Sequence, residues 1–204
     1  MNQSNIGLLD LPNEILLIIF KKLDNMDVLY SLLCVNNRRL DTIIQENDFA
    51  SILNFVLTSS FNATFAPVDL RVDQFCTSIL RKIHHKVKTL IVDLISLKSI
   101  VYAARYPNLT ELKLFNHTTD LYACILKFFE DLKYLSIIGL YPHYYPSLVL
   151  SNVPSTTFFS STLNKLCIRV RRFEDCLALL DGRLKQLTIL IIVIENMEYA
   201  SSNV

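Results

Sequence analysis

The stretch that most constrains the fold is Leu11–Asp24, LPNEILLIIFKKLD, close to the start of the chain. Pro12 suits the first position of a helix, and six consecutive apolar residues follow from Ile15 to Phe20. At about 100° per residue the apolar side chains cover an arc of roughly 260°, whereas an ordinary surface helix needs little more than about 100°. One packing neighbour cannot cover so wide an arc. The helix is therefore either buried in a bundle or shared between its own domain and another protein.

Two further short helices are predicted directly after this one. Asp24 and Asn25 supply a cap for the first, and Asn36 is the predicted cap of the second. Three short helices in so few residues make too small a unit to enclose the apolar arc alone. This favours a partner protein over the alternative, in which the helices merely pack on the domain that follows.

Several anchors with characteristic spacing run through this helical segment. They read Leu-Pro-x-Glu-Ile-Leu, Ile-Phe-x-x-Leu-Asp, Asp-Val-Leu, and a Cys-Val step followed by two arginines. The anchor residues are Leu11, Pro12, Glu14, Ile15, Leu16, Ile19, Phe20, Leu23, Asp24, Asp27, Val28, Leu29, Cys34, Val35, Arg38 and Arg39. Together they make the stretch from Leu11 to Phe49 resemble the F-box.

The resemblance implies a partner. F-boxes dock, largely through apolar contacts, on the Skp adaptor of cullin–RING (SCF) ubiquitin ligases. The residues expected to form the shared core and interface are Leu11, Pro12, Ile15, Leu16, Ile19 and Val35. The sequence does not divide them between core and interface.

A second pattern begins at Val87, where the phrase apolar-x-x-Leu-x-apolar recurs roughly every 20–30 residues, a spacing typical of repeat arrays. It starts at Val87, Leu109, Leu132, Leu163 and Leu184. Helix-like segments lie between the phrases, at 96–106, 119–131 and 172–182. Strands that alternate with helices predict parallel strands. The array resembles degenerate leucine-rich repeats, and an irregular α/β fold with accidental leucine spacing is the alternative.

The predicted fold class is therefore α/β. We expect a three-helix F-box at 5–50, linker helices at 51–86, and a short leucine-rich-repeat-like solenoid with about five parallel strand units at 87–204. Within the linker we expect a short helix and a connector over 51–67, and a helix over 72–85. An F-box followed by such repeats resembles substrate receptors of SCF ligases, in which the repeats hold the target. The alternative function is a repeat-based protein-binding scaffold unconnected with ubiquitin.

The repeats contain two candidate target-binding features. An insertion at 139–161 clusters Tyr141, Tyr144 and Tyr145 among prolines, and tyrosines on stiff loops make good contact anchors. Arg169 and Arg171 could accept an acidic or phosphorylated segment. The alternatives are that the tyrosines pack against their own repeat, and that the arginines form a solvated edge. At the chain end, the apolar strand TILIIVI invites pairing.

Composition limits the other function classes. With three glycines, the chain offers no phosphate-binding loop or nucleophile elbow, so we predict a non-catalytic protein without cofactor or metal. The net charge of +1 argues against nucleic acid as a partner. Apolar runs stay far below the roughly 20 residues that span a membrane. Five scattered cysteines and no recognisable signal peptide favour the cytoplasm, the nucleus or both.

Overall fold

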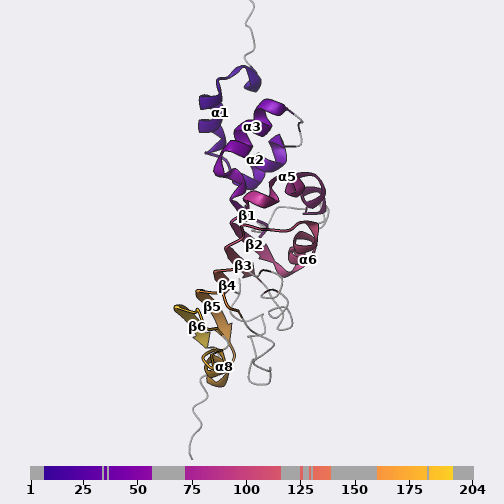
Figure 1. The fold of residues 1–204 in the computed structure, drawn as a ribbon. Coiled ribbons are helices and arrows are strands. Elements are labelled where there is room, and N and C mark those ends of the chain that lie inside the picture. Colours follow the sequence, from indigo (N-terminus) through magenta and orange to yellow (C-terminus); the bar gives the residue numbers. More distant parts are fainter. Residues whose placement is uncertain are drawn as a thin grey trace, which may run out of the picture.

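The computed structural model describes residues 7–33, 35, 37–56, 72–115, 125, 129, 131–138, 160–182 and 184–194. Within these residues, a group of short helices is followed by one six-stranded sheet. Figure 1 shows the helices at one end of an elongated molecule and the strands succeeding one another toward the other end. This arrangement confirms the predicted α/β class, with a helical N-terminal region and parallel strands after it.

The N-terminal helices form a small bundle. They are η1 (Leu8–Asp10), α1 (Asn13–Phe20), α2 (Asn25–Leu32), α3 (Arg38–Glu46) and η2 (Asp48–Ala50). The Asp24 carboxylate accepts a hydrogen bond of 2.8 Å from the Met26 N–H and so caps α2, as predicted. The cap of α3 is Asn37 rather than the expected Asn36, because its amide oxygen accepts from the backbone N–H groups of Arg39 and Leu40.

The sheet contains six parallel strands in sequence order. They are β1 (Ile52–Asn54), β2 (Thr89–Asp93), β3 (Glu111–Phe115), β4 (Tyr134–Ile138), β5 (Lys165–Val170) and β6 (Ile189–Ile194). Each strand pairs only with its sequence neighbours, so every connection adds the next strand on the same side. The helix predicted over 119–131 and the insertion at 139–161 lie almost entirely outside the described residues.

Two parts of the sheet correct the sequence prediction. Residues 52–54 form β1 and pair with β2, whereas a short helix was expected there. In the last repeat the register aligns Leu166 with Leu190, so the phrase starts at Leu187 and not at Leu184. The array therefore begins one strand earlier than predicted and its last unit lies further along the chain.

The recurring leucine of each phrase points into the core. Its six occurrences align across the sheet: Leu53, Leu90, Leu112, Leu135, Leu166 and Leu190. The first five are buried, and Leu190 on the edge strand is half-buried. Side chains between the phrase positions point to the other face of each strand, because successive strand residues alternate. The phrase thus marks the inner face of the sheet.

A repeated hydrogen-bond pattern joins the strands at their N-terminal ends. The carbonyl of Ser51 accepts from two consecutive N–H groups, those of Lys88 and Thr89, each at 2.9 Å. The same pattern recurs at each of the next four junctions, with the acceptors Lys88, Thr110, Lys133 and Asn164. Identical pairing at every junction shows that the units are structurally equivalent despite their different lengths.

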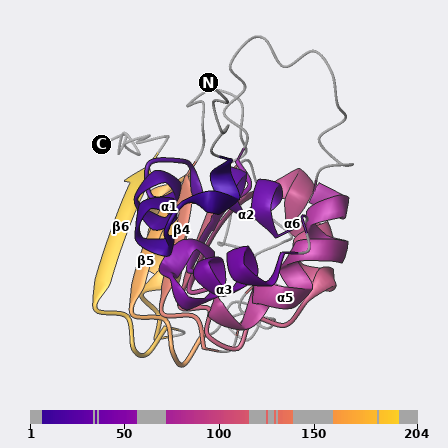
Figure 2. The ribbon, with the colours of Figure 1, turned by 90° about the horizontal axis from the view of Figure 1, so that it is seen from above.

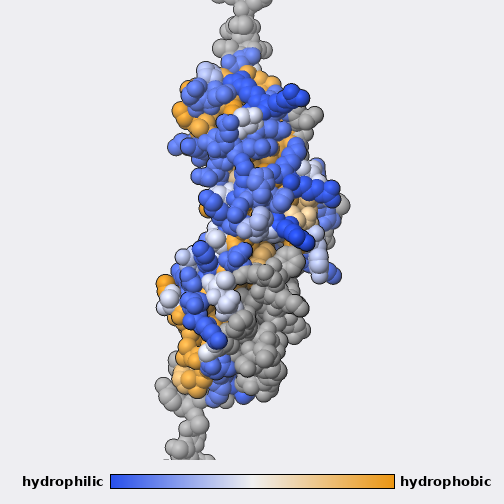
Figure 3. Space-filling model, viewed as in Figure 1, coloured by the Kyte–Doolittle hydropathy of each residue, from blue (hydrophilic) through white to orange (hydrophobic). Residues whose placement is uncertain are grey.

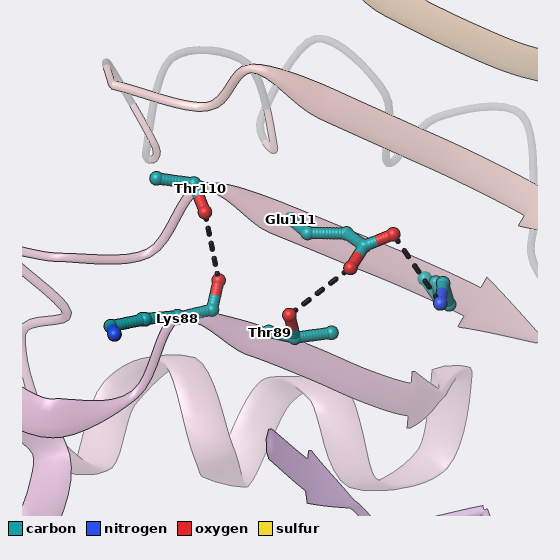
Figure 4. A network of polar contacts seen from close by, with 5 residues as sticks. Lys88, Thr89, Thr110 and Glu111 are labelled. Carbon is teal, nitrogen blue, oxygen red and sulfur yellow. Dashed lines mark hydrogen bonds and ion pairs between the residues drawn. The ribbon is translucent and has the colours of Figure 1, made fainter. Parts of the chain in front are cut away.

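On the outer face, polar side chains add contacts between neighbouring strands (Figure 4). Thr89 donates a hydrogen bond of 3.0 Å to the Glu111 carboxylate, whose other oxygen pairs with the Lys113 ammonium at 3.3 Å. Thr110 donates to the Lys88 carbonyl at 3.3 Å. The hydrogen bond from Thr89 ties β2 to β3 where the sheet faces away from the helices, and the ion pair between Glu111 and Lys113 lies within β3.

The described helices that connect the strands cover one face of the sheet. They are η3 (Phe75–Leu80), α5 (Arg81–Ile83), η4 (His84–Lys86), α6 (Leu94–Ala103) and α8 (Phe173–Leu179). The view from above places α5 and α6 to one side of the strands (Figure 2). Phe75 of η3 contacts Tyr30 of α2 and Phe55 after β1, with ring centroids 4.8 and 5.2 Å apart. One apolar core therefore runs from the bundle into the sheet.

Two lysines also join the bundle to the rest of the chain. The Lys82 ammonium donates to the carbonyl of Leu33 at 3.2 Å, at the end of α2. The Lys86 ammonium donates to the Gln45 carbonyl in the last turn of α3. Helix C-termini carry unpaired carbonyls and partial negative charge, so a cation is stabilising at both places.

We expect Lys82→Ala and Lys86→Ala each to lower the free energy of unfolding by about 1 kcal/mol, since each removes a cation from a helix C-terminus. The matched control is Arg81→Ala, which removes an exposed cation next to Lys82 in α5. Urea unfolding followed by circular dichroism measures the difference. Equal stability of all three variants would contradict a stabilising role for these two contacts.

Candidate protein-binding surface

The start of α1 is held in place by one arginine. The Arg39 guanidinium donates to the Asn13 amide oxygen at 2.7 Å, to the Leu9 carbonyl at 2.7 Å and to the Leu11 carbonyl at 2.5 Å. A guanidinium suits this position because its planar fork presents several donors at once. Arg39 therefore fixes residues 9–13 against the N-terminus of α3.

Helix α1 divides its apolar side chains between two directions. Leu16 and Phe20, one turn apart, point into the bundle and are buried. Ile15, Ile18 and Ile19 lie on another side of the helix and remain 43%, 58% and 37% exposed. The bundle and the sheet together leave these isoleucines uncovered, as the width of the apolar arc predicted.

The bundle exposes further large apolar side chains, which come before and after these isoleucines in the sequence. The exposed large apolar residues of the bundle are Leu8, Leu9, Ile15, Ile18, Ile19, Leu23 and Val35, and we call them the N-terminal apolar surface. Orange patches at the α1 end of the space-filling view mark part of it (Figure 3). Single exposed apolar residues are ordinary, whereas a gathering of this kind indicates contact with another protein.

The six predicted partner-binding residues fall into three groups. Pro12, Ile15, Ile19 and Val35 are exposed. Leu11 is half-buried and packs on the edge of the core. Leu16 is 0% exposed, so we assign it to the core and remove it from the predicted binding residues.

Sequence reasoning left out Leu8, Leu9, Ile18 and Leu23. The helical wheel could have indicated Ile18, because this residue lies between Ile15 and the polar sector of Glu14 and Lys21. Leu8 and Leu9 belong to η1, a short turn of helix without a periodic pattern long enough to recognise.

Comparison with protein families matches residues 8–38 to the F-box domain. This stretch contains η1, α1, α2 and the start of α3. Residues 8–38 form an F-box domain. Among curated proteins, none matches the chain. The family match thus falls on the bundle, and the N-terminal apolar surface belongs to the F-box.

The outer face of the sheet is a second candidate surface. Arg169 lies half-buried on β5, and Arg171 is exposed just after this strand. Tyr141, Tyr144 and Tyr145 lie outside the described residues. Tyr134, an aromatic residue that the sequence did not single out, is 41% exposed on the outer face of β4.

Two ionisable groups of the described chain have a clearly raised pKa, and both lie in the core. Burial, reinforced by the nearby Asp73 charge, raises the pKa of the Cys76 thiol to about 11. Burial also raises the pKa of Tyr106, whose hydroxyl donates a 2.6 Å hydrogen bond to the Ile100 carbonyl. Both groups therefore stay protonated at neutral pH, which gives the thiol little nucleophilic character.

The described part of the chain offers neither a metal site nor a membrane-spanning helix. No group of three or more His, Cys, Asp and Glu side chains there is placed to hold a metal ion. No helix among the same residues is long and apolar enough to cross a bilayer.

Proposed function

We propose that the protein is a substrate-recognition adaptor of a cullin–RING (SCF-type) ubiquitin ligase. Its F-box would bind a Skp-type adaptor, and the repeat-like sheet would bind a target protein. The observation that carries the proposal is the F-box domain at 8–38 with an apolar surface that is exposed in the described part of the chain. The protein would act in the cytoplasm, the nucleus or both.

The N-terminal apolar surface supports the first half of this function. Its isoleucines and leucines are about half exposed, so a second protein that covers them gains roughly half of the 1.5–3 kcal/mol that full burial of each side chain contributes. Arg39 holds Leu11 and Pro12 in position beside it, so little order is lost on binding. The proposed contacts with the Skp-type adaptor are Pro12, Ile15, Ile19 and Val35. Leu11 lies at the margin of this set.

The sheet supports the second half. Its strands are parallel, follow one another in sequence order and share one recurring leucine, which agrees with a degenerate leucine-rich-repeat array. Described helices cover its inner face, and the outer face carries exposed side chains, Tyr134 among them, that a target could contact. On the described part of the outer face, the proposed target contacts are Arg169, Arg171 and Tyr134. Three more target contacts are proposed from sequence alone: Tyr141, Tyr144 and Tyr145.

In this role the protein supplies proximity rather than chemistry. The adaptor would hold a target on the sheet and a ligase at the F-box, and so raise the effective concentration of one near the other. Transfer of ubiquitin to the target would then occur within one complex. The acid, base and nucleophile would all belong to other subunits.

The direct test is complex formation between the purified full chain and a purified Skp-type adaptor. We expect a stable complex on gel filtration, with adaptor affinity lowered in the variant Leu11→Ala/Pro12→Ala while its circular dichroism spectrum is retained. If the intact chain forms no complex at micromolar concentrations of both proteins, the ligase assignment is wrong. A repeat-based scaffold unconnected with ubiquitin would then be the better description.

A further inference from the structure

The last strand of the sheet is apolar on both faces. On the outer face, Ile189, Ile191 and Val193 are 48%, 46% and 48% exposed. On the inner face, Leu190, Ile192 and Ile194 are only half-buried. No strand of the described chain lies beyond β6. Strands that are apolar on both faces usually lie inside a parallel sheet, whereas an edge of this composition favours pairing with another strand.

The helix nearest to this edge adds a second apolar stripe. Phe173, Leu177 and Leu180, at the start of α8, near its end and just after it, are exposed at spacings of one and two helical turns. Leu179 and Asp175 point the opposite way into the core. Figure 3 shows apolar surface gathered at the β6 and α8 end of the molecule. Both the strand layer and the helix layer therefore present apolar side chains at one end.

The backbone of β6 can accept a partner strand of defined register. The N–H of Ile189 donates to the Asn164 carbonyl, so the backbone N–H and C=O groups of Ile189 point toward β5. The backbone groups of Ile191 and Val193 point the same way, because the direction alternates along a strand. The N–H and C=O groups of Leu190, Ile192 and Ile194 consequently point toward the free edge.

We propose that a second copy of this chain pairs with β6 in antiparallel register, about a two-fold axis through Ile191. Leu190 of one copy then lies opposite Ile192 of the other, and the two pairs exchange four hydrogen bonds. Ile191 lies opposite its own counterpart, and Ile189 opposite Val193. The two sheets join into one continuous sheet of twelve strands.

A second copy fits this edge for three reasons. Every opposed pair consists of aliphatic residues, mostly β-branched, which is a favourable cross-strand combination. The strand carries no charge, and the nearest cations, Lys165 and Arg169 on β5, would lie roughly 14 Å or more from their counterparts, beyond the screening length. A two-fold axis normal to the sheet also keeps the helices of both copies on one side, so α8 approaches α8.

The size of the surface predicts a weak dimer. One strand edge and one helical stripe fall at the small end of specific interfaces, below about 1,200 Å² in total. We therefore expect dissociation in the micromolar range and not in the nanomolar range. This inference is independent of ligase binding, because the F-box lies at the other end of the molecule (Figure 1).

The register is tested by cysteine cross-linking of the full chain. In Ile191→Cys the two Cα atoms would be about 4.5 Å apart, within the range that a disulfide bridges. In the control Ile189→Cys they would be roughly 13 Å apart, which is too far. We expect mild oxidation to link Ile191→Cys dimers, but neither the control nor the unmodified chain with its native cysteines. Equal linking at both positions, or linking at neither, overturns the proposed pairing.

The association itself is tested by sedimentation. We expect a concentration-dependent dimer for the unmodified chain and a monomer for Ile191→Lys, which places two like charges directly opposite each other across the joint. The control Ile52→Lys changes an equally exposed isoleucine, 46% against 46%, on the opposite edge strand, and should leave the dimer intact. A chain that is monomeric throughout the micromolar range, or a dimer that survives Ile191→Lys, rules the proposal out. Binding of the Skp-type adaptor should be the same in all these variants.

Discussion

Replacing Ile15 and Ile19 together by glutamate is expected to weaken binding of a Skp-type adaptor by about 100-fold or more. Full burial of an isoleucine contributes about 1.5–3 kcal/mol, and the areas still exposed, 43% for Ile15 and 37% for Ile19, would contribute somewhat under half of that each. Every 1.4 kcal/mol is a factor of ten in the dissociation constant. A carboxylate placed in an apolar interface adds a desolvation cost. Because both isoleucines are exposed in the free chain, the thermal unfolding midpoint should change little. Isothermal titration calorimetry and circular dichroism measure the two quantities.

The control for this variant is Ile52→Glu. Ile52 is exposed to a similar degree, 46% against 43% for Ile15, but lies on β1 and outside the N-terminal apolar surface. It should bind the adaptor as the unmodified chain does. If the double variant binds normally, these isoleucines do not contact the adaptor, and another face of the F-box must do so.

Replacing Arg39 by lysine is expected to lower the free energy of unfolding by about 2 kcal/mol or more, since hydrogen bonds to charged groups contribute roughly 1.5–3 kcal/mol each. Lysine keeps the charge but cannot reach Asn13, Leu9 and Leu11 together, because it lacks the planar fork. Adaptor affinity should fall as well, since Leu11 and Pro12 would lose their fixed position. Chemical denaturation and calorimetry measure both effects.

Arg38→Lys is the matched control for Arg39→Lys. Arg38 is the preceding residue, begins the same helix and is exposed, so the change should affect neither stability nor binding. If Arg39→Lys is as stable as this control, the three hydrogen bonds contribute nothing measurable and the position of Leu11 depends on packing alone.

The helical bundle could be predicted well from sequence because its signals are local. Asp24 identified the start of α2, and the width of the apolar arc on α1 indicated that one packing neighbour could not cover this helix. The division between core and surface could not be predicted, since Leu16 and Ile15 are equally apolar neighbours. Only the tertiary packing of the bundle decides that Leu16 is buried and Ile15 exposed.

The sheet shows where apolar patterns become ambiguous. In the last repeat almost every residue is apolar, so the phrase fits from Leu184 and equally well from Leu187. Hydrogen bonding with β5 selects the second register, which no local feature indicates. At β1 only three residues are paired, and Ile52 and Leu53 gave no alternation long enough to distinguish a strand from a helix.

The equal spacing of the strands has a consequence for the geometry of a ligase complex. Adjacent strands lie roughly 4.8 Å apart, and the six strands follow one another in sequence order. The first strand, β1, is therefore about 24 Å from the last, β6. Cargo seated near β6 would stand that much farther from the F-box than cargo seated near β1. Which lysine of the cargo comes within reach of the ubiquitin-carrying enzyme would then depend on the strand at which it is held.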